Sequence, residues 1–339
     1  MIAIILILLL SIFPWITNVR AQENTIKIVA SMETFAAIAK FIGGDRVSVE
    51  YILPEGADPH DYSLTYSDVE KIKSADILVL AHSDFFSLEQ QILENSKGKL
   101  YVDFPDYEKY NLTILAIPGI EKNYHGYWIY PDNALAIAHA ITEKLMQYDP
   151  EHEELYERNL AMFEEKISQL KQLLKEVSIE DGLRGYGAII AVPGAAYLAY
   201  AFGMSIKASL LKGPGRFINA SELTRIREEA KRGSIKIIFC PVSLFSGKVG
   251  ELAREVSKET GIPIAYVRIF SSGGLTDYFA LMMYNIGVVS SVERERSASI
   301  SDEVLVLLYT ALAILFIIAF VELLIIYKYK KHAEEEWNV

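Results

Sequence analysis

The sequence predicts an α/β protein of two lobes, each a parallel β-sheet flanked by helices, joined by a long backbone helix and followed by a C-terminal transmembrane helix. Three observations support this fold class. In both halves of the chain, short apolar runs of strand length alternate with helix-like segments, which is typical of parallel sheets covered by helices. One long amphipathic segment separates the halves. A continuous apolar run lies near the C-terminus.

The first half of the chain begins with a predicted strand at 26–30. The helix after it ends where Gly43 and Gly44 occur, because glycine commonly follows a last helical turn. Ser67 and Glu70 have the spacing of a capping box that opens another helix. Further strands are predicted at 47–53, 76–80, 100–102 and 112–117, with helices at 67–73, 88–93 and 132–147.

The long segment that separates the halves starts at Asp149-Pro150, with aspartate as the predicted N-cap and proline in the first helical position. A long amphipathic helix of this kind fits either a surface helix of one domain or a helix that joins two lobes. Beyond it, strands are predicted at 188–192, 235–240 and 263–269, and helices at 195–202, 221–231, 247–259 and 277–285. The apolar stripe of the long helix comprises Leu160, Phe163, Ile167, Leu170, Leu174 and Val177.

Composition excludes one class of partner and one kind of scaffold. The 339 residues carry a formal net charge of −11, which argues against nucleic acid, since phosphate binding needs a basic surface. Cys240 is the single cysteine, so no disulfide framework can form within the chain.

The two ends of the chain predict an extracytoplasmic body. Residues 1–22 are predicted to be a signal peptide, with an apolar run followed by Val19 and Ala21 before the cleavage point; an uncleaved N-terminal anchor is the alternative. Residues 304–327 are long and apolar enough to cross a bilayer, and the lysines that follow place the C-terminus in the cytoplasm. Two sequons, beginning at Asn111 and Asn219, fit this placement.

These features divide the chain into seven segments. After the signal peptide come an N-terminal lobe at 25–148, a connecting backbone helix at 149–178 and a C-terminal lobe at 184–289. A juxtamembrane linker at 290–303, the transmembrane helix at 304–327 and a cytoplasmic tail at 328–339 complete the division.

The loop Gly56-Ala57-Asp58-Pro59-His60-Asp61-Tyr62-Ser63 lies where a predicted strand is followed by a helix, the edge at which open α/β sheets bind ligands. This octapeptide resembles the first metal-ligand loop of the zinc- and manganese-binding solute-binding proteins of ABC transporters, a family that includes adhesin-type lipoproteins. Similarity extends over roughly 26–290, with matching segments in the family's order at 42–47, 62–76, 128–134, 149–159, 197–203 and 278–285. The resemblance favours a backbone helix that joins two lobes.

The resemblance also implies a ligand set, and the sequence retains part of it. His60 corresponds to the histidine of the first loop, and His125 to the one before Trp128, displaced by one position. The third expected ligand falls at Val192-Pro193, and the fourth falls near Arg268. The chain therefore lacks the expected second-lobe ligands.

Other residues can complete a site, because the carboxyl ends of parallel strands meet at one edge of a sheet. His82 follows the strand at 76–80, and Cys240 ends the strand at 235–240. Asp277 follows a glycine-rich loop, with helix capping as its alternative role. The candidate metal ligands are His60, His125, His82, Cys240 and Asp277, with Asp58 or Asp61 expected to orient the His60 ring.

The predicted function is extracytoplasmic binding of a divalent transition metal for delivery to an ABC permease, with zinc ahead of manganese because the candidate ligands include several histidines. The metal ion is the bound solute. The alternative is a membrane-tethered binding or adhesion module with a degenerate metal site and no transport role. An enzyme is not predicted, because the sequence has neither an H-E-x-x-H helix nor a G-x-S-x-G turn.

Overall fold

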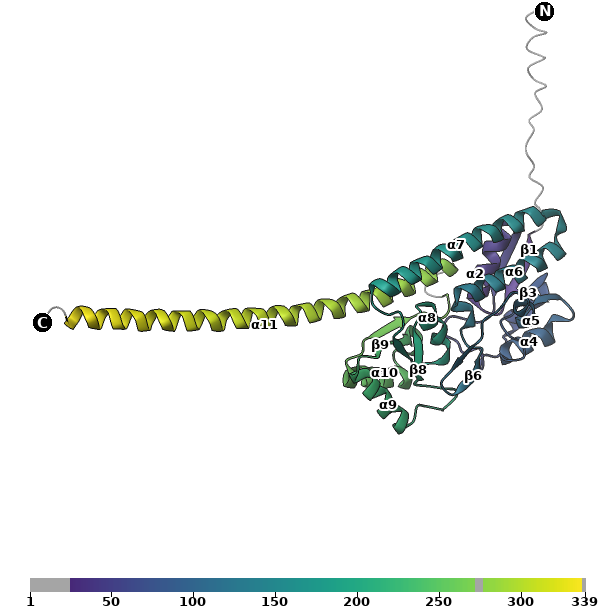
Figure 1. The fold of residues 1–339 in the computed structure, drawn as a ribbon. Coiled ribbons are helices and arrows are strands. Elements are labelled where there is room, and N and C mark those ends of the chain that lie inside the picture. Colours follow the sequence, from purple (N-terminus) through teal and green to yellow (C-terminus); the bar gives the residue numbers. More distant parts are fainter. Residues whose placement is uncertain (1–24, 272–276, 337–339) are drawn as a thin grey trace, which may run out of the picture. The chain divides into compact units, whose positions relative to one another are not determined.

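The computed structural model describes residues 25–271 and 277–336, and the chain divides into two compact units. Unit 1 comprises the chain up to Tyr110 together with Ala136–Phe163. Unit 2 comprises Asn111–Leu135 and the chain from Glu164 onward. The two longest helices before the C-terminal one, α6 (Pro131–Tyr148) and α7 (Glu153–Glu180), each contribute residues to both units (Figure 1).

Unit 1 is built on a four-stranded parallel sheet in the order β2-β1-β3-β4. Its strands are β1 (Ile26–Ala30), β2 (Val47–Tyr51), β3 (Ile77–Val79) and β4 (Leu100–Val102), close to the predicted ranges. The helices between them are α2 (Glu33–Gly43), α3 (Tyr66–Ser74), α4 (Ser87–Ser96) and α5 (Phe104–Glu108), the last of which was not predicted. Because β1 pairs with both β2 and β3, the loops after these strands open at one edge of the sheet.

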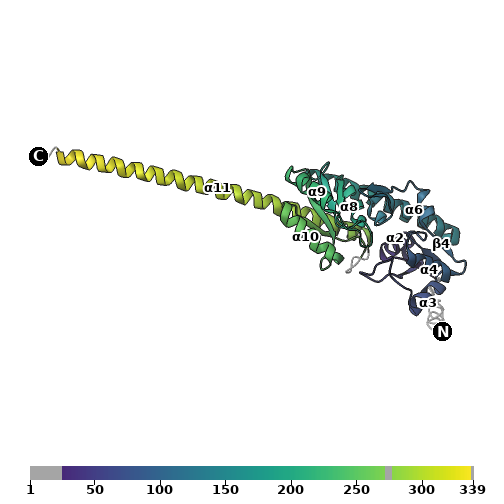
Figure 2. The same ribbon diagram turned by 90° about the horizontal axis from the view of Figure 1, so that it is seen from below.

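Unit 2 contains a second four-stranded parallel sheet, in the order β10-β9-β7-β8. Its strands are β7 (Gly187–Ile190), β8 (Ser205–Ser209), β9 (Ile235–Pro241) and β10 (Ile264–Val267). The edge strand β8 was not predicted, because its serines and lysine interrupt the apolar pattern. The helices α8 (Ala196–Ala201), α9 (Ala220–Lys231) and α10 (Lys248–Thr260) accompany these strands, and α9 lies beside α10 (Figure 2).

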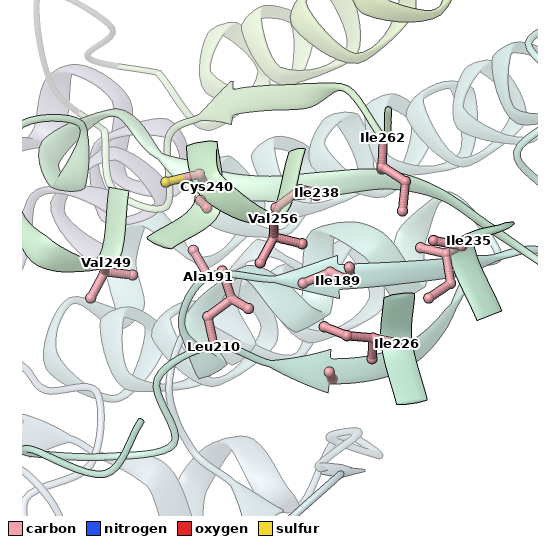
Figure 3. Close-up of a cluster of buried hydrophobic side chains, with 13 residues drawn as sticks. Ile189, Ala191, Leu210, Ile226, Ile235, Ile238, Cys240, Val249, Val256 and Ile262 are labelled. Atoms are coloured by element: carbon pink, nitrogen blue, oxygen red, sulfur yellow. The ribbon is translucent and has the colours of Figure 1, made fainter. Parts of the chain in front are cut away.

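The hydrophobic core of unit 2 forms where α9 and α10 cover one face of this sheet (Figure 3). Ile189 and Ile238 project from the strands, and Ile226 and Val256 project from the helices. Removing such side chains from water is the main stabilising contribution, at roughly 25 cal/mol per Å² of apolar surface.

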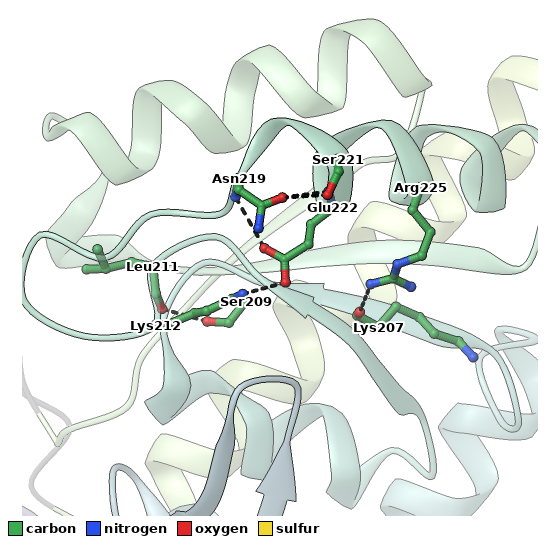
Figure 4. A network of polar contacts seen from close by, with 8 residues as sticks. All are labelled: Lys207, Ser209, Leu211, Lys212, Asn219, Ser221, Glu222 and Arg225. Atoms are coloured by element: carbon green, nitrogen blue, oxygen red, sulfur yellow. Dashed lines mark hydrogen bonds and ion pairs between the residues drawn. The ribbon is translucent and has the colours of Figure 1, made fainter.

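Polar contacts fasten α9 to the sheet (Figure 4). Asn219 is the N-cap of α9: its side chain accepts the N–H of Glu222, whose carboxylate in turn accepts the N–H of Asn219. Glu222 also pairs with Lys212 (Nζ–Oε1 2.5 Å), and Arg225 donates to the carbonyl of Lys207. The asparagine of the second sequon thus has a structural role through its carbonyl oxygen.

The segment 111–135 differs from the prediction that it belongs to the first lobe. Its strands β5 (Leu115–Ile117) and β6 (Ile120–Asn123) pair antiparallel in a separate two-stranded sheet, rather than joining the parallel one. Buried hydrogen bonds within unit 2 explain the change. Asn123 donates to the carbonyl of Pro193, and Trp128 Nε1 donates to the carbonyl of Ile269.

Two predicted helix starts are also corrected. The capping box of α3 is formed by Thr65 and Asp68, two residues before the predicted Ser67 and Glu70. Asp149 does not cap the α-helix, because a 3₁₀ turn, Pro150–His152, precedes α7. Its carboxylate instead binds Arg46 (3.2 Å), Tyr156 (2.7 Å) and His152 (3.0 Å) within unit 1.

The C-terminal helix α11 extends from Tyr278 to Glu336 without interruption. Residues 290–303, predicted as a linker, are therefore helical; they contain neither proline nor glycine to end the helix. In the part of the chain that the structure describes, this is the one helix long and apolar enough to cross a membrane, over Val306–Leu323, and none of that stretch is buried.

We expect Ile238→Ala to lower the free energy of unfolding by about 2–5 kcal/mol, because it leaves a cavity in the core of unit 2. The measurement is urea unfolding of the full chain in detergent, followed by circular dichroism. Ile179→Ala is the matched control, since this side chain is 56% exposed and its removal should change stability by less than about 0.5 kcal/mol. Equal losses for the two variants would contradict the assignment of this core.

Candidate metal-binding loops

The five candidate ligands are divided between the units. His60 and His82 belong to unit 1, and His125, Cys240 and Asp277 belong to unit 2. Over the described ranges, no group of three or more His, Cys, Asp or Glu side chains lies close enough together to hold a metal ion.

The loop that carries His60 follows β2 and is fastened to the start of α4. The carbonyl of Pro59 accepts the N–H of Leu88 (3.3 Å), and the carbonyl of His60 accepts the hydroxyl of Ser87 (2.7 Å). Asp58 accepts the backbone N–H of His60 (2.9 Å), a contact different from the imidazole contact that the sequence suggested. These bonds hold the backbone of the loop in one conformation.

Aromatic side chains hold the rings of both histidines of unit 1. The His60 ring packs against Phe85 and Phe86, with ring centroids 5.4 and 5.1 Å apart. The His82 ring stacks on Phe104 at 4.1 Å and also contacts Phe85 at 5.9 Å. Phe85 therefore contacts both imidazoles, so the loops after β2 and β3 form one continuous surface.

The environment of His82 favours its neutral form. Burial lowers the pKa of this imidazole, although the carboxylates of Asp103, Asp84 and Glu108 act in the opposite direction. A neutral imidazole is the form that coordinates metal ions. His82 is thus chemically ready to act as a ligand near neutral pH.

The loop that carries His125 is held in unit 2 by backbone and buried side chains. Asn123 accepts the N–H of His125 (3.2 Å), and Tyr197 donates its hydroxyl to the carbonyl of Asn123 (2.5 Å). At Gly126, an added Cβ would lie 2.3 Å from the carbonyl oxygen of Gly194, so only glycine permits this approach.

Pro193, in the third expected ligand position, and Ile269, directly after the fourth at Arg268, lie beside this loop. Pro193 and Ile269 accept the hydrogen bonds from Asn123 and Trp128 described above. Neither residue has a side chain that can coordinate a metal ion. Arg268 lies over the ring of Tyr284 (5.1 Å), and its backbone is bonded on both sides by Asn285.

Cys240 and Asp277 have other contacts in the structure. Cys240 belongs to the hydrophobic core of unit 2, and burial raises the pKa of its thiol to about 11. Because the thiolate is the form that binds metals, this environment favours packing over coordination. Asp277 accepts the N–H of Phe279 (2.9 Å) at the start of α11, which is the capping role considered as its alternative.

Two further histidines, His139 and His152, lie outside the candidate loops. His139 stacks on Tyr110 (5.0 Å), and His152 binds Asp149. An open groove in unit 2, lined in part by Tyr130, Tyr200 and Arg184, includes none of the five candidate ligands.

Sequence reasoning missed the two buried carboxylates behind the His82 loop, Glu89 and Asp103. Glu89 accepts the N–H groups of Ala81 (2.6 Å) and His82 (2.5 Å), and Asp103 accepts that of Ser83 (3.1 Å). A signal was present for Glu89. It falls at helical spacing on the face of α4 that buries Leu88 and Ile92, where a charged residue is unexpected.

We expect Glu89 to make the stability of the protein pH-dependent. Burial, opposed by the nearby Ser31 hydroxyl and by the hydrogen bond from Ala81, raises its pKa from 4.5 to about 7. The folded protein therefore keeps this proton when the unfolded chain has lost it. Its contribution to stability is fully present below about pH 4.5 and declines by on the order of 3 kcal/mol as the pH rises through about 7.

The check is urea unfolding of the metal-free full chain at pH 4.5 and 7.5. Glu89→Gln should remove this decline, because glutamine does not titrate. Glu94→Gln, at an exposed position of α4, should retain it. An identical pH dependence in wild type and Glu89→Gln would show that Glu89 does not carry this effect.

Comparison with known proteins agrees with the geometry of the two sheets. A family model described as zinc-uptake complex component A, periplasmic (ZnuA) matches residues 28–292. The metal ABC transporter substrate-binding lipoprotein ScbA of Streptococcus cristatus is 24% identical over 311 residues, covering 83% of this chain and 95% of the relative. The iron ABC transporter substrate-binding lipoprotein MtsA of Streptococcus pyogenes serotype M1 is 25% identical, covering 80% of this chain and 89% of the relative.

Among solved structures, the laminin-binding protein Lmb of Streptococcus agalactiae has the same fold, with a TM-score of 0.65 at 23% identity. The likeness covers 79% of this chain and 99% of Lmb, which is described as a bifunctional protein with adhesin and metal-transporting activity. The family model covers most of the chain, including both parallel sheets and the loops of His60 and His125. The chain therefore belongs to the ZnuA family, the metal-binding substrate-binding proteins of ABC transporters.

Proposed function

We propose that this protein binds a divalent transition metal ion outside the cytoplasmic membrane and delivers it to an ABC permease. The observation that carries the proposal is the arrangement of His60 and His82. Their loops follow β2 and β3, on either side of β1, and both rings contact Phe85. This edge is where parallel α/β sheets bind their ligands.

The chemistry of the candidate ligands supports zinc ahead of manganese. His60, His82 and His125 are proposed as ligands, and imidazole nitrogen suits zinc, whereas a shell rich in carboxylates would suit manganese. The description of the matching family names zinc, and the relative MtsA is named for iron. Cys240 and Asp277 rank behind the histidines because each has a structural contact.

The proposed role is binding and delivery without catalysis. The relatives are named as substrate-binding components of transporters, a class that captures a solute for a permease. The metal ion is accordingly the cargo.

We further propose that α11 tethers the body to the membrane, with the C-terminus in the cytoplasm. Its apolar side chains over Val306–Leu323 are exposed to the surroundings, as a lipid-facing helix requires, and lysines follow the apolar run. ScbA and MtsA are named lipoproteins. In this chain Cys240, the single cysteine, is buried in the core of unit 2 and is out of reach of a lipid.

A second candidate function is a tethered binding or adhesion module with a degenerate metal site. The observation in its favour is that Pro193 and Ile269, which cannot coordinate metal through their side chains, lie beside the loop of His125. The two candidates differ in one measurable property, the affinity of the full chain for metal.

We expect the full chain in detergent to bind zinc with a Kd below about 1 μM, and His60→Ala to weaken binding at least tenfold, or about 1.4 kcal/mol, because a ligand is lost. Competition with a zinc chelator measures both constants, and manganese is titrated in parallel. His139→Gln is the control, since this ring stacks on Tyr110 outside the candidate loops. Zinc binding weaker than micromolar, unchanged in His60→Ala, would favour the adhesion module.

We expect a chain that ends at residue 303 to be released from membranes, because it lacks the apolar stretch of α11. Fractionation of cells that express the full and shortened chains measures the share in each fraction. Retention of the shortened chain in the membrane fraction would place the anchor elsewhere, for which residues 1–22 are the alternative.

A further inference from the structure

Three consecutive backbone N–H groups in unit 1 are donated to two carboxylates. The N–H of Ala81 is donated to Oε1 of Glu89 (2.6 Å), and the N–H of His82 is donated to Oε2 (2.5 Å). Both oxygens of this carboxylate therefore accept a hydrogen bond from the loop. Ser83 donates its N–H to Asp103 at 3.1 Å, and its hydroxyl binds the same carboxylate. The backbone of the loop after β3 is therefore held by hydrogen bonds at each of the residues 81–83.

Both carboxylates are buried. Glu89 is 0% exposed and Asp103 is 6% exposed. Burial of a carboxylate is costly unless hydrogen bonds compensate it, and an apolar side chain at position 89 would pack with Leu88 and Ile92 on the same face of α4 at no such cost. The carboxylate of Glu89 therefore serves the loop that it binds more than the packing of the helix.

The conformation of this loop determines where two imidazoles lie. The carbonyl of His82 accepts the N–H groups of Phe85 (2.9 Å) and Phe86 (3.0 Å), and these two rings contact His60. The His82 ring stacks on Phe104, whose own N–H is donated to Asp103 at 2.7 Å. A change in the direction of the N–H groups of 81–83 would thus move both rings.

Glu89 also connects two strand ends. The Ser31 hydroxyl, directly after β1, is fully buried beside Glu89, where it opposes the rise in the pKa of the Glu89 carboxyl. The backbone N–H of Ser31 is donated to the carbonyl of Val79 in β3 (2.8 Å). Glu89 therefore lies at the point where the sheet order reverses from β1 to β3, which is the expected place of the ligand.

We propose that Glu89 is a positioning residue that sets the orientation of the His82 and His60 imidazoles for metal binding. The role of Glu89 in metal binding rests on the proposed function. Its role in orienting the two imidazole rings does not depend on that function. Glutamine at this site has one acceptor oxygen and one donor NH₂ group, so one of the two N–H groups would face a donor and the loop would turn.

The test compares wild type, Glu89→Gln and the exposed-site control Glu94→Gln as full chains in detergent. Imidazole ¹H–¹⁵N spectra of the metal-free protein, with histidine labelled, report the environment of each ring. We expect the His82 and His60 signals to shift in Glu89→Gln and those of His139 and His152 to stay. Zinc affinity, measured by chelator competition, should fall about 10- to 100-fold, as for other residues that orient ligands.

The possible outcomes separate positioning from stability and from metal binding. A purely structural Glu89 would lower the unfolding midpoint in Glu89→Gln but leave the imidazole signals unmoved, which overturns the inference. If wild type binds no zinc, the proposed function fails and the metal-free spectra alone decide the inference. If Glu89→Gln does not fold, Ser31→Ala removes the buried hydroxyl beside Glu89, and unmoved His82 and His60 signals in that variant also overturn it.

Discussion

The pairing of β1 between β2 and β3 is the constraint on which the candidate site of unit 1 depends. All three strands are parallel, so the loops that follow them open at the same edge of the sheet. His60 and His82 follow the two outer strands of this set, and Ser31 follows the central one. Because this register is set by backbone hydrogen bonds, it places the two imidazoles against one ring, that of Phe85.

Buried polar groups then give these loops a defined conformation. Hydrophobic packing is non-directional and would tolerate several arrangements of a loop, whereas a bidentate carboxylate accepts N–H groups only from fixed directions. Glu89 and Asp103 supply this directionality to 81–83, and Phe85 extends it to the ring of His60. The cost of burying Glu89 is visible in its pKa of about 7.

Unit 2 uses different means to hold its candidate histidine. Asn123, Tyr197 and Trp128 make buried hydrogen bonds that fasten the loop of His125 to backbone carbonyl groups. At two of these contact points lie Pro193 and Ile269, whose side chains cannot coordinate a metal ion. The loop of His125 is thus fixed by backbone contacts, and neither Pro193 nor Ile269 adds a side chain that coordinates metal.

The sequence by itself determined the local elements and the first candidate ligand. The strands of both parallel sheets, except β8, follow from apolar runs, and the helices follow from their 3.6-residue periodicity, because these patterns depend on neighbours in sequence. His60 was found from its loop, and Val306–Leu323 from its composition. The tertiary structure alone decided that 111–135 belongs to unit 2, that Cys240 lies in a core, and that Glu89 binds the His82 loop. Each depends on which strands and loops meet after folding, and a buried hydrogen bond between distant residues leaves no periodic signal in the sequence.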